Sequence, residues 1–196
     1  LMGIMRPAMV FTSLQNASYN INRQQTNIKQ FEFGNIYRQS KKGFFEEERL
    51  GITASGMQIA DTWRMDAGPA DWYFVKATLE QILVRLGVDV SKLKAQPSAN
   101  DWFSFGMDWM LGEKPIMSGG QISTQMKKAF DIKQKEVYYL EIRWAELVKL
   151  RQDGISIGDL PKYPAVRRDL ALLIDQSIEY AQLENLAFQT ERKLLK

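Results

Sequence analysis

The segment Val137–Trp144 constrains the fold of this 196-residue chain more than any other feature of its sequence. Bulky apolar side chains occupy every second position of the segment: Tyr138, Leu140, Ile142 and Trp144. The positions between them include the charged residues Glu141 and Arg143. This period of two is expected of a β-strand with one buried and one exposed face. The segment therefore predicts a half-buried strand in a sheet.

Four other segments have the character of strands. Phe31–Tyr37 and Leu50–Met57 contain aromatic and β-branched residues in partial alternation, which predicts an antiparallel pair. Trp102–Met110 and Pro115–Ile122 predict two further strands, joined across residues 111–114. These segments make a mainly antiparallel sheet the expected framework of the chain.

The first helix is predicted to begin at Pro7, whose missing N–H would have no partner in a first turn, and to continue to Arg23. Apolar side chains recur along it at steps of three and four: Val10, Leu14, Ala17 and Ile21. Its other face is rich in amides, which form directional hydrogen bonds. Two interpretations stay open: packing in the chain's own core with a solvated outer face, or pairing with a helix of another chain.

A second helix is predicted from the N-cap Asp71 to the terminating Gly87, and a short third helix covers Thr124–Phe130. Five tryptophans are spread over different elements: Trp63, Trp72, Trp102, Trp109 and Trp144. We expect them in the core, in preference to stacking on single-stranded RNA.

The composition changes after Gly154, which predicts a unit over residues 1–153, a linker over 154–164 and a second unit over 165–196. In the second unit, Leu170–Ile174 is a continuous apolar run suited to a strand buried on both faces, and a helix follows from Tyr180. One strand and one helix cannot bury their apolar faces alone. Because the chain also opens at Leu1, we expect it to be a fragment with a truncated second unit.

The sequence contains neither Cys nor His. Their absence excludes a disulfide framework, a zinc finger, a cysteine nucleophile and a Ser-His-Asp triad. The net charge is only +3, from 26 basic and 23 acidic residues, which is weak evidence for a nucleic-acid partner. No run of apolar residues is long enough for a membrane span, so we expect a cytoplasmic protein without a membrane partner.

Several strings of the sequence resemble the bacterial phenylalanyl-tRNA synthetase β-subunit family. They are Met5-Arg6-Pro7, Tyr19–Arg23, Phe31–Gly34 and Trp72–Lys76. The most specific string, Tyr163–Leu172, is similar to the opening of that family's ferredoxin-like anticodon-binding domain. The resemblance implies an α+β fold: a class II aminoacyl-tRNA synthetase-like antiparallel sheet flanked by helices, followed by a truncated βα piece of the ferredoxin-like domain.

The resemblance also implies a function. The chain would be a non-catalytic module for assembly with the α subunit in an (αβ)2 heterotetramer and for placement of the tRNA for phenylalanine. ATP and magnesium would serve the parent enzyme, and we expect no catalytic residue, cofactor or metal site in this chain. Candidate residues at the subunit interface are Met9, Val10, Leu14, Tyr19, Asn20, Asn22 and Arg23. Candidate tRNA contacts are Lys162, Arg167 and Arg168, although pairing of the arginines with Asp169 is an equal alternative.

The sequence lacks the residues expected to hold a triphosphate, and this absence supports the non-catalytic interpretation. Activation of a carboxylate by ATP needs cations where charge develops on the phosphates. Active class II enzymes place arginines in a Phe-Arg-x-Glu strand and at the end of a glycine-rich segment, and this sequence has neither pattern. At the strand Phe31–Gly34 it has Glu32, which would repel phosphate. A stand-alone enzyme and a stand-alone RNA-binding module remain the alternatives.

Overall fold

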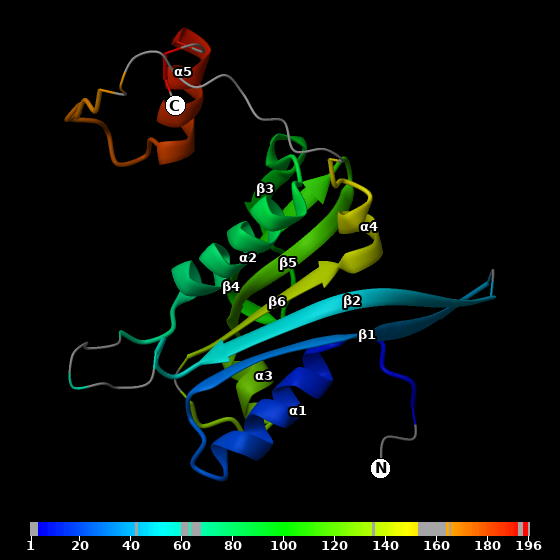
Figure 1. The fold of residues 1–196 in the computed structure, drawn as a ribbon. Coiled ribbons are helices and arrows are strands. Elements are labelled where there is room, and N and C mark those ends of the chain that lie inside the picture. The colour runs from blue at the N-terminus through cyan, green and yellow to red at the C-terminus, as the bar shows by residue number, and fades with distance from the viewer. Residues whose placement is uncertain are drawn as a thin grey trace. The chain divides into compact units, whose positions relative to one another are not determined.

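The computed structural model describes residues 4–41, 43–59, 63, 68–134, 136–152, 164, 166–191 and 194–195. The chain divides into two compact units, Leu1–Gly154 and Ile155–Lys196. The first unit contains a six-stranded antiparallel sheet with helices packed on both faces (Figure 1). The described part of the second unit contains the helix α5 (Tyr180–Thr190).

The strands of the sheet are β1 (Ile28–Ser40), β2 (Gly43–Ser55), β3 (Lys94–Pro97), β4 (Phe103–Leu111), β5 (Lys114–Ile122) and β6 (Val137–Arg143). Their order across the sheet is β1-β2-β6-β5-β4-β3, so β6 lies between the two hairpins. The helices of this unit are α1 (Val10–Ile21), α2 (Trp72–Leu86), α3 (Thr124–Ala129) and α4 (Trp144–Val148), with a short 3-10 turn at Val90–Lys92.

Two apolar clusters cover the two faces of the sheet. One lies under α2 and includes Leu79, Leu140 and Ile142. The other lies under α1 and includes Leu14 and Tyr139. The prediction of a half-buried β6 was therefore wrong: every residue of β6 except its last is buried. A central strand with helices on both sides has no solvent face, although its sequence alternates.

Both predicted hairpins are confirmed, and β1 and β2 are longer than expected, with Ser40 facing Gly43 at the turn. The second helix is also confirmed at both ends. The Asp71 side chain accepts a hydrogen bond from the Phe74 N–H, and Gly87 ends α2 with a left-handed φ of 65°.

The first helix starts at Val10, not at Pro7 as predicted. The reason is the segment before it, which is held on the outer edge of β1: the Tyr37 N–H donates to the Arg6 carbonyl at 2.9 Å. The chain has to leave that edge before it can turn into a helix.

Four of the five tryptophans pack partly buried against the two clusters, as predicted. Trp63 is the exception, because it is 97% exposed in the connection between β2 and α2. The short strand β3 and the helix α4 were not anticipated from the sequence.

In the second unit, the helix from Tyr180 is confirmed, but the predicted strand Leu170–Ile174 is not present. These residues have no strand pairing, and Leu173 is fully exposed. A strand needs a neighbour to bond its backbone, and the described residues of this unit contain no other strand. Nor do the described residues of either unit contain a helix long and apolar enough to cross a membrane.

Candidate functional site

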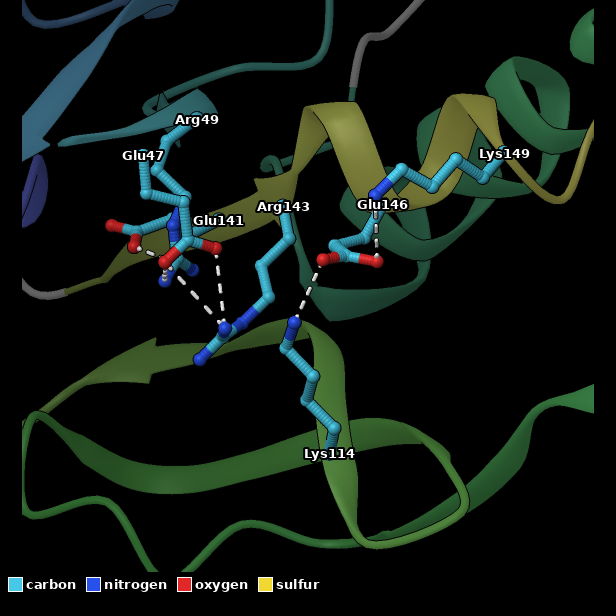
Figure 2. A network of polar contacts seen from close by, with 7 residues as sticks. All are labelled: Glu47, Arg49, Lys114, Glu141, Arg143, Glu146 and Lys149. Carbon is cyan, nitrogen blue, oxygen red and sulfur yellow. Dashed lines mark hydrogen bonds and ion pairs between the residues drawn. The ribbon is translucent and has the colours of Figure 1, made fainter. Parts of the chain in front are cut away.

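Two arginines and two glutamates form a network on the face of the sheet that also carries α1 (Figure 2). Arg49 of β2 lies directly opposite Arg143 of β6 in the strand register. The Nη2 of Arg49 is 3.0 Å from Glu47 Oε2, and its Nη1 is 3.3 Å from Glu141 Oε1. The Nη1 of Arg143 is 3.1 Å from Glu47 Oε1. Each guanidinium is therefore neutralised by a carboxylate of the same chain.

The network continues under α1 through a buried tyrosine. The hydroxyl of Tyr139 donates to Glu141 Oε2 at 2.7 Å. Burial, followed by the charge of Glu141, raises the pKa of Tyr139 well above its usual value, so the hydroxyl keeps its proton. Gly51 leaves room for this hydroxyl, because a Cβ at position 51 would lie 3.1 Å from it. Both oxygens of Glu141 thus have partners inside the protein.

Burial also lowers the pKa of Arg143, and the neighbouring positive charge of Arg49 adds to this effect. A third arginine, Arg38 of β1, lines the same site from the next strand outward. Glu32, the carboxylate expected to repel phosphate, is not in this site. It pairs with Arg6 at 2.5 Å instead.

The network borders a cavity of about 140 Å³. It is lined by Arg38, Arg49, Asn100, Trp102, Phe103, Pro115, Ile116, Ser118, Tyr139, Glu141 and Arg143. Pockets that enclose a drug-sized ligand hold roughly 300–1,000 Å³, so this cavity is too small for an adenine nucleotide. Two of its three arginines are also already paired. The residues that line this cavity therefore do not fit ATP. Among the residues that the structure describes, no group of three acidic side chains could hold a metal ion.

The interface candidates on and around α1 fall into two groups. Met9, Val10 and Leu14 are fully buried, and Val10 and Leu14 belong to the cluster under α1. Their side chains leave no surface for a partner, because they already fill the core of the unit.

The remaining candidates form a polar surface at the end of α1, which we name the α1 flank: Tyr19, Asn20, Asn22 and Arg23. The Tyr19 side chain is 56% exposed, and the Arg23 guanidinium lies 3.5 Å from the centre of its ring. The Asn20 amide donates to the Asn16 carbonyl at 2.8 Å. The cation–π contact holds two long side chains in a defined position before any partner binds.

The tRNA candidates lie in or before the second unit. Arg167 and Arg168 are exposed. The Nε of Arg167 is 3.6 Å from Asp169 Oδ1, which is the alternative pairing considered from the sequence. Both side chains are about 90% exposed, so this ion pair contributes little to stability. Lys162 lies outside the described residues.

Comparison with known proteins identifies the family. The family described as "Phenylalanyl tRNA synthetase beta chain CLM domain" matches residues 1–144. The chain belongs to the phenylalanyl-tRNA synthetase β chain family. The resemblance noted in the sequence is thereby confirmed.

Relatives within the phenylalanyl-tRNA synthetase β chain family match nearly the whole chain. The phenylalanine–tRNA ligase beta subunit of Bacteroides thetaiotaomicron is 37% identical over 98% of this chain and 25% of its own length. That of Porphyromonas gingivalis is 31% identical over the same shares of the two chains. The chain thus spans about a quarter of the length of these relatives.

A solved structure of pyrrolysyl-tRNA synthetase from Desulfitobacterium hafniense is similar to this β-chain segment in fold. The TM-score is 0.54 at 16% identity, over 73% of this chain and 48% of that chain. At this identity the likeness concerns the fold alone. It confirms the expected α+β architecture with a class II synthetase-like antiparallel sheet.

The network of Glu47, Arg49, Glu141 and Arg143 was missed by the sequence analysis. The alternation along β6 placed Glu141 and Arg143 on a solvent face, where charges need no explanation. A usable signal was present in β2, where Arg49 follows three consecutive glutamates just before an apolar run. Charges on both central strands could have been interpreted as partners.

Proposed function

We propose that this segment of a phenylalanine–tRNA ligase β subunit is a non-catalytic scaffold. It would hold the α subunit and help place tRNA in an enzyme that attaches phenylalanine to its tRNA with ATP. The observation that carries the proposal is the neutralised pair Arg49 and Arg143 in a cavity of about 140 Å³. A triphosphate needs unpaired cations at the positions where charge develops, so ATP and magnesium belong to the α subunit in this proposal.

The α1 flank is the surface that we assign to the α subunit in an (αβ)2 heterotetramer. Tyrosine and arginine are enriched among the residues that dominate binding energy at protein interfaces. Tyr19 and Arg23 supply both types in contact with each other, and amides beside them can bond at the rim. The buried residues of α1 hold the helix on the sheet and so position this flank.

Co-purification of the full-length β subunit with its α subunit tests the assignment. Tyr19→Ala and Arg23→Ala are expected to weaken association at least tenfold. Tyr73→Ala is the matched control, because Tyr73 is an equally large side chain, 74% exposed, on α2. Association that survives both α1-flank substitutions, or that falls equally with the control, would show that this flank is not the interface.

A catalytic assay tests the other part of the proposal. The 196-residue chain alone is expected to show no ATP–pyrophosphate exchange with phenylalanine. Exchange at a rate comparable to that of a synthetase would support the stand-alone enzyme instead.

For tRNA, we assign Arg167 and Arg168 as contacts, together with Lys162, because exposed guanidinium groups bind phosphates through two parallel hydrogen bonds. Arg168→Gln in the heterotetramer is expected to remove one phosphate contact. The slope of log tRNA affinity against log salt concentration should then become shallower by about 0.7–0.9. Tight tRNA binding by the 196-residue chain alone in physiological salt would favour the RNA-binding module.

A further inference from the structure

The cavity beside the arginine–glutamate network has more positive than negative charge. Three arginines line it from the adjacent strands β1, β2 and β6: Arg38, Arg49 and Arg143. The network has two carboxylates: Glu47 contacts both Arg49 and Arg143, and Glu141 contacts Arg49. One positive charge therefore remains uncompensated. Among the described residues, no carboxylate forms an ion pair with Arg38.

Buried hydrogen-bond donors at the cavity also lack acceptors. The Arg49 side chain is only 8% exposed, yet its Nε finds no acceptor within the described part of the chain. The Nε of Arg143 is also buried and has no acceptor among the described residues. A buried N–H without an acceptor is unfavourable, and native proteins rarely leave one. Two such groups on side chains that line one cavity indicate that an acceptor from outside the chain belongs there.

The remaining polar side chains of the cavity suit an anion. The Asn100 Oδ1 accepts from the Trp102 N–H, so its amide nitrogen is left as a donor. Ser118 adds a hydroxyl. Glu141, the one carboxylate that lines the cavity, already binds Arg49 and the Tyr139 hydroxyl through its two oxygens. Its charge is therefore offset by Arg49 and by the hydrogen bond from the Tyr139 hydroxyl.

We propose that this cavity binds a single phosphate group between Arg38, Arg49 and Arg143. Guanidinium forks match the geometry of phosphate oxygens, and a tetrahedral dianion offers more acceptor oxygens to three arginines, an amide and a hydroxyl than a carboxylate does. The volume of about 140 Å³ admits a phosphate group but not a nucleoside attached to it. The site is thus distinct from a pocket that encloses a whole nucleotide.

Titration of the 196-residue chain with inorganic phosphate at constant ionic strength tests the proposal. We expect saturable binding to one site, measured by calorimetry, and a higher melting temperature in phosphate than in chloride. Arg38→Gln is expected to weaken binding at least tenfold. Arg38 is exposed, so its replacement leaves the core unchanged. Arg85→Gln removes the same charge from the exposed surface of α2 and is expected to have no effect.

Competition between tRNA and phosphate identifies the source of the phosphate group. If tRNA competes with phosphate and Arg38→Gln weakens both, the phosphate group is that of a polynucleotide; without competition, the ligand is the free anion. Absence of saturable phosphate binding, equal loss in the Arg38→Gln and Arg85→Gln variants, or equally tight binding of acetate would overturn the proposal.

Discussion

Gly34 in β1 has a structural role that a double-mutant cycle can isolate. A Cβ built at this position would overlap the Nη2 atom of Arg6, and the next two nearest atoms belong to the side chains of Arg6 and Glu32. The φ of Gly34 lies outside the left-handed region, so alanine can adopt this backbone conformation. The severe clash that Gly34→Ala creates is therefore with Arg6, whose guanidinium has to move away from the strand.

The contacts of Arg6 determine the magnitude. Its Nε donates to the Asn35 carbonyl at 2.8 Å, and its Nη1 lies 2.5 Å from Glu32 Oε1. A hydrogen bond with a charged partner contributes about 1.5–3 kcal/mol. The ion pair adds at most about 1 kcal/mol, because the Glu32 side chain is 42% exposed. Alanine in a strand regains about 0.5–1 kcal/mol relative to glycine. Gly34→Ala is therefore expected to lower the free energy of unfolding by about 2 kcal/mol, within a range of about 0.5–3.5 kcal/mol.

The sign should reverse when Arg6 is absent. In an Arg6→Ala background, Gly34→Ala is expected to stabilise the protein by about 0.5–1 kcal/mol, since only the gain in the strand remains. Urea unfolding followed by tryptophan fluorescence measures all four proteins of the cycle. If Gly34→Ala costs the same with and without Arg6, the clash is not its cause and the reasoning fails.

Two further predictions concern α2 and β6. Asp71→Ala is expected to lower the free energy of unfolding by about 1 kcal/mol, because the Phe74 N–H loses its acceptor, whereas Asp71→Asn keeps the cap; equal urea midpoints for the alanine and asparagine variants would contradict this. Burial, followed by the charge and hydrogen bond of Glu136, raises the pKa of Tyr138 to about 12. The unfolded chain releases this proton near pH 10, so the contribution of Tyr138 is complete below that pH and is lost as the pH rises towards 12. The stability difference between wild type and Tyr138→Phe should therefore shrink between pH 9 and pH 11.5, and a constant difference would show that this pKa is not raised.

Local features of the fold could be predicted from the sequence because they depend on neighbours along the chain. The Asp71 cap, the left-handed Gly87 and both hairpins are set by interactions over a few residues. Contacts between residues far apart in the sequence could not be predicted. The edge contact of Arg6 delayed the start of α1 by three residues relative to Pro7, and nothing near Pro7 in the sequence signals it.

The candidate site shows the same division. Family strings and the missing triphosphate motifs could be recognised from the sequence, and they were sufficient for the non-catalytic proposal. The arginine–glutamate network could not be recognised from the sequence, because Glu47 and Arg143 are 96 residues apart and meet only where β2 pairs with β6.

Sequence alone determined the long strands of the sheet and the helices α1 and α2, since periodicity and capping act within each segment, but it did not reveal β3 or α4. Only the tertiary structure decided which faces of those segments are covered. Burial depends on what packs against a strand, and α1 and α2 enclose β6 from both sides. That enclosure placed Glu141 and Arg143 in a network with Glu47 and Arg49, where their alternating pattern alone had predicted exposed charges.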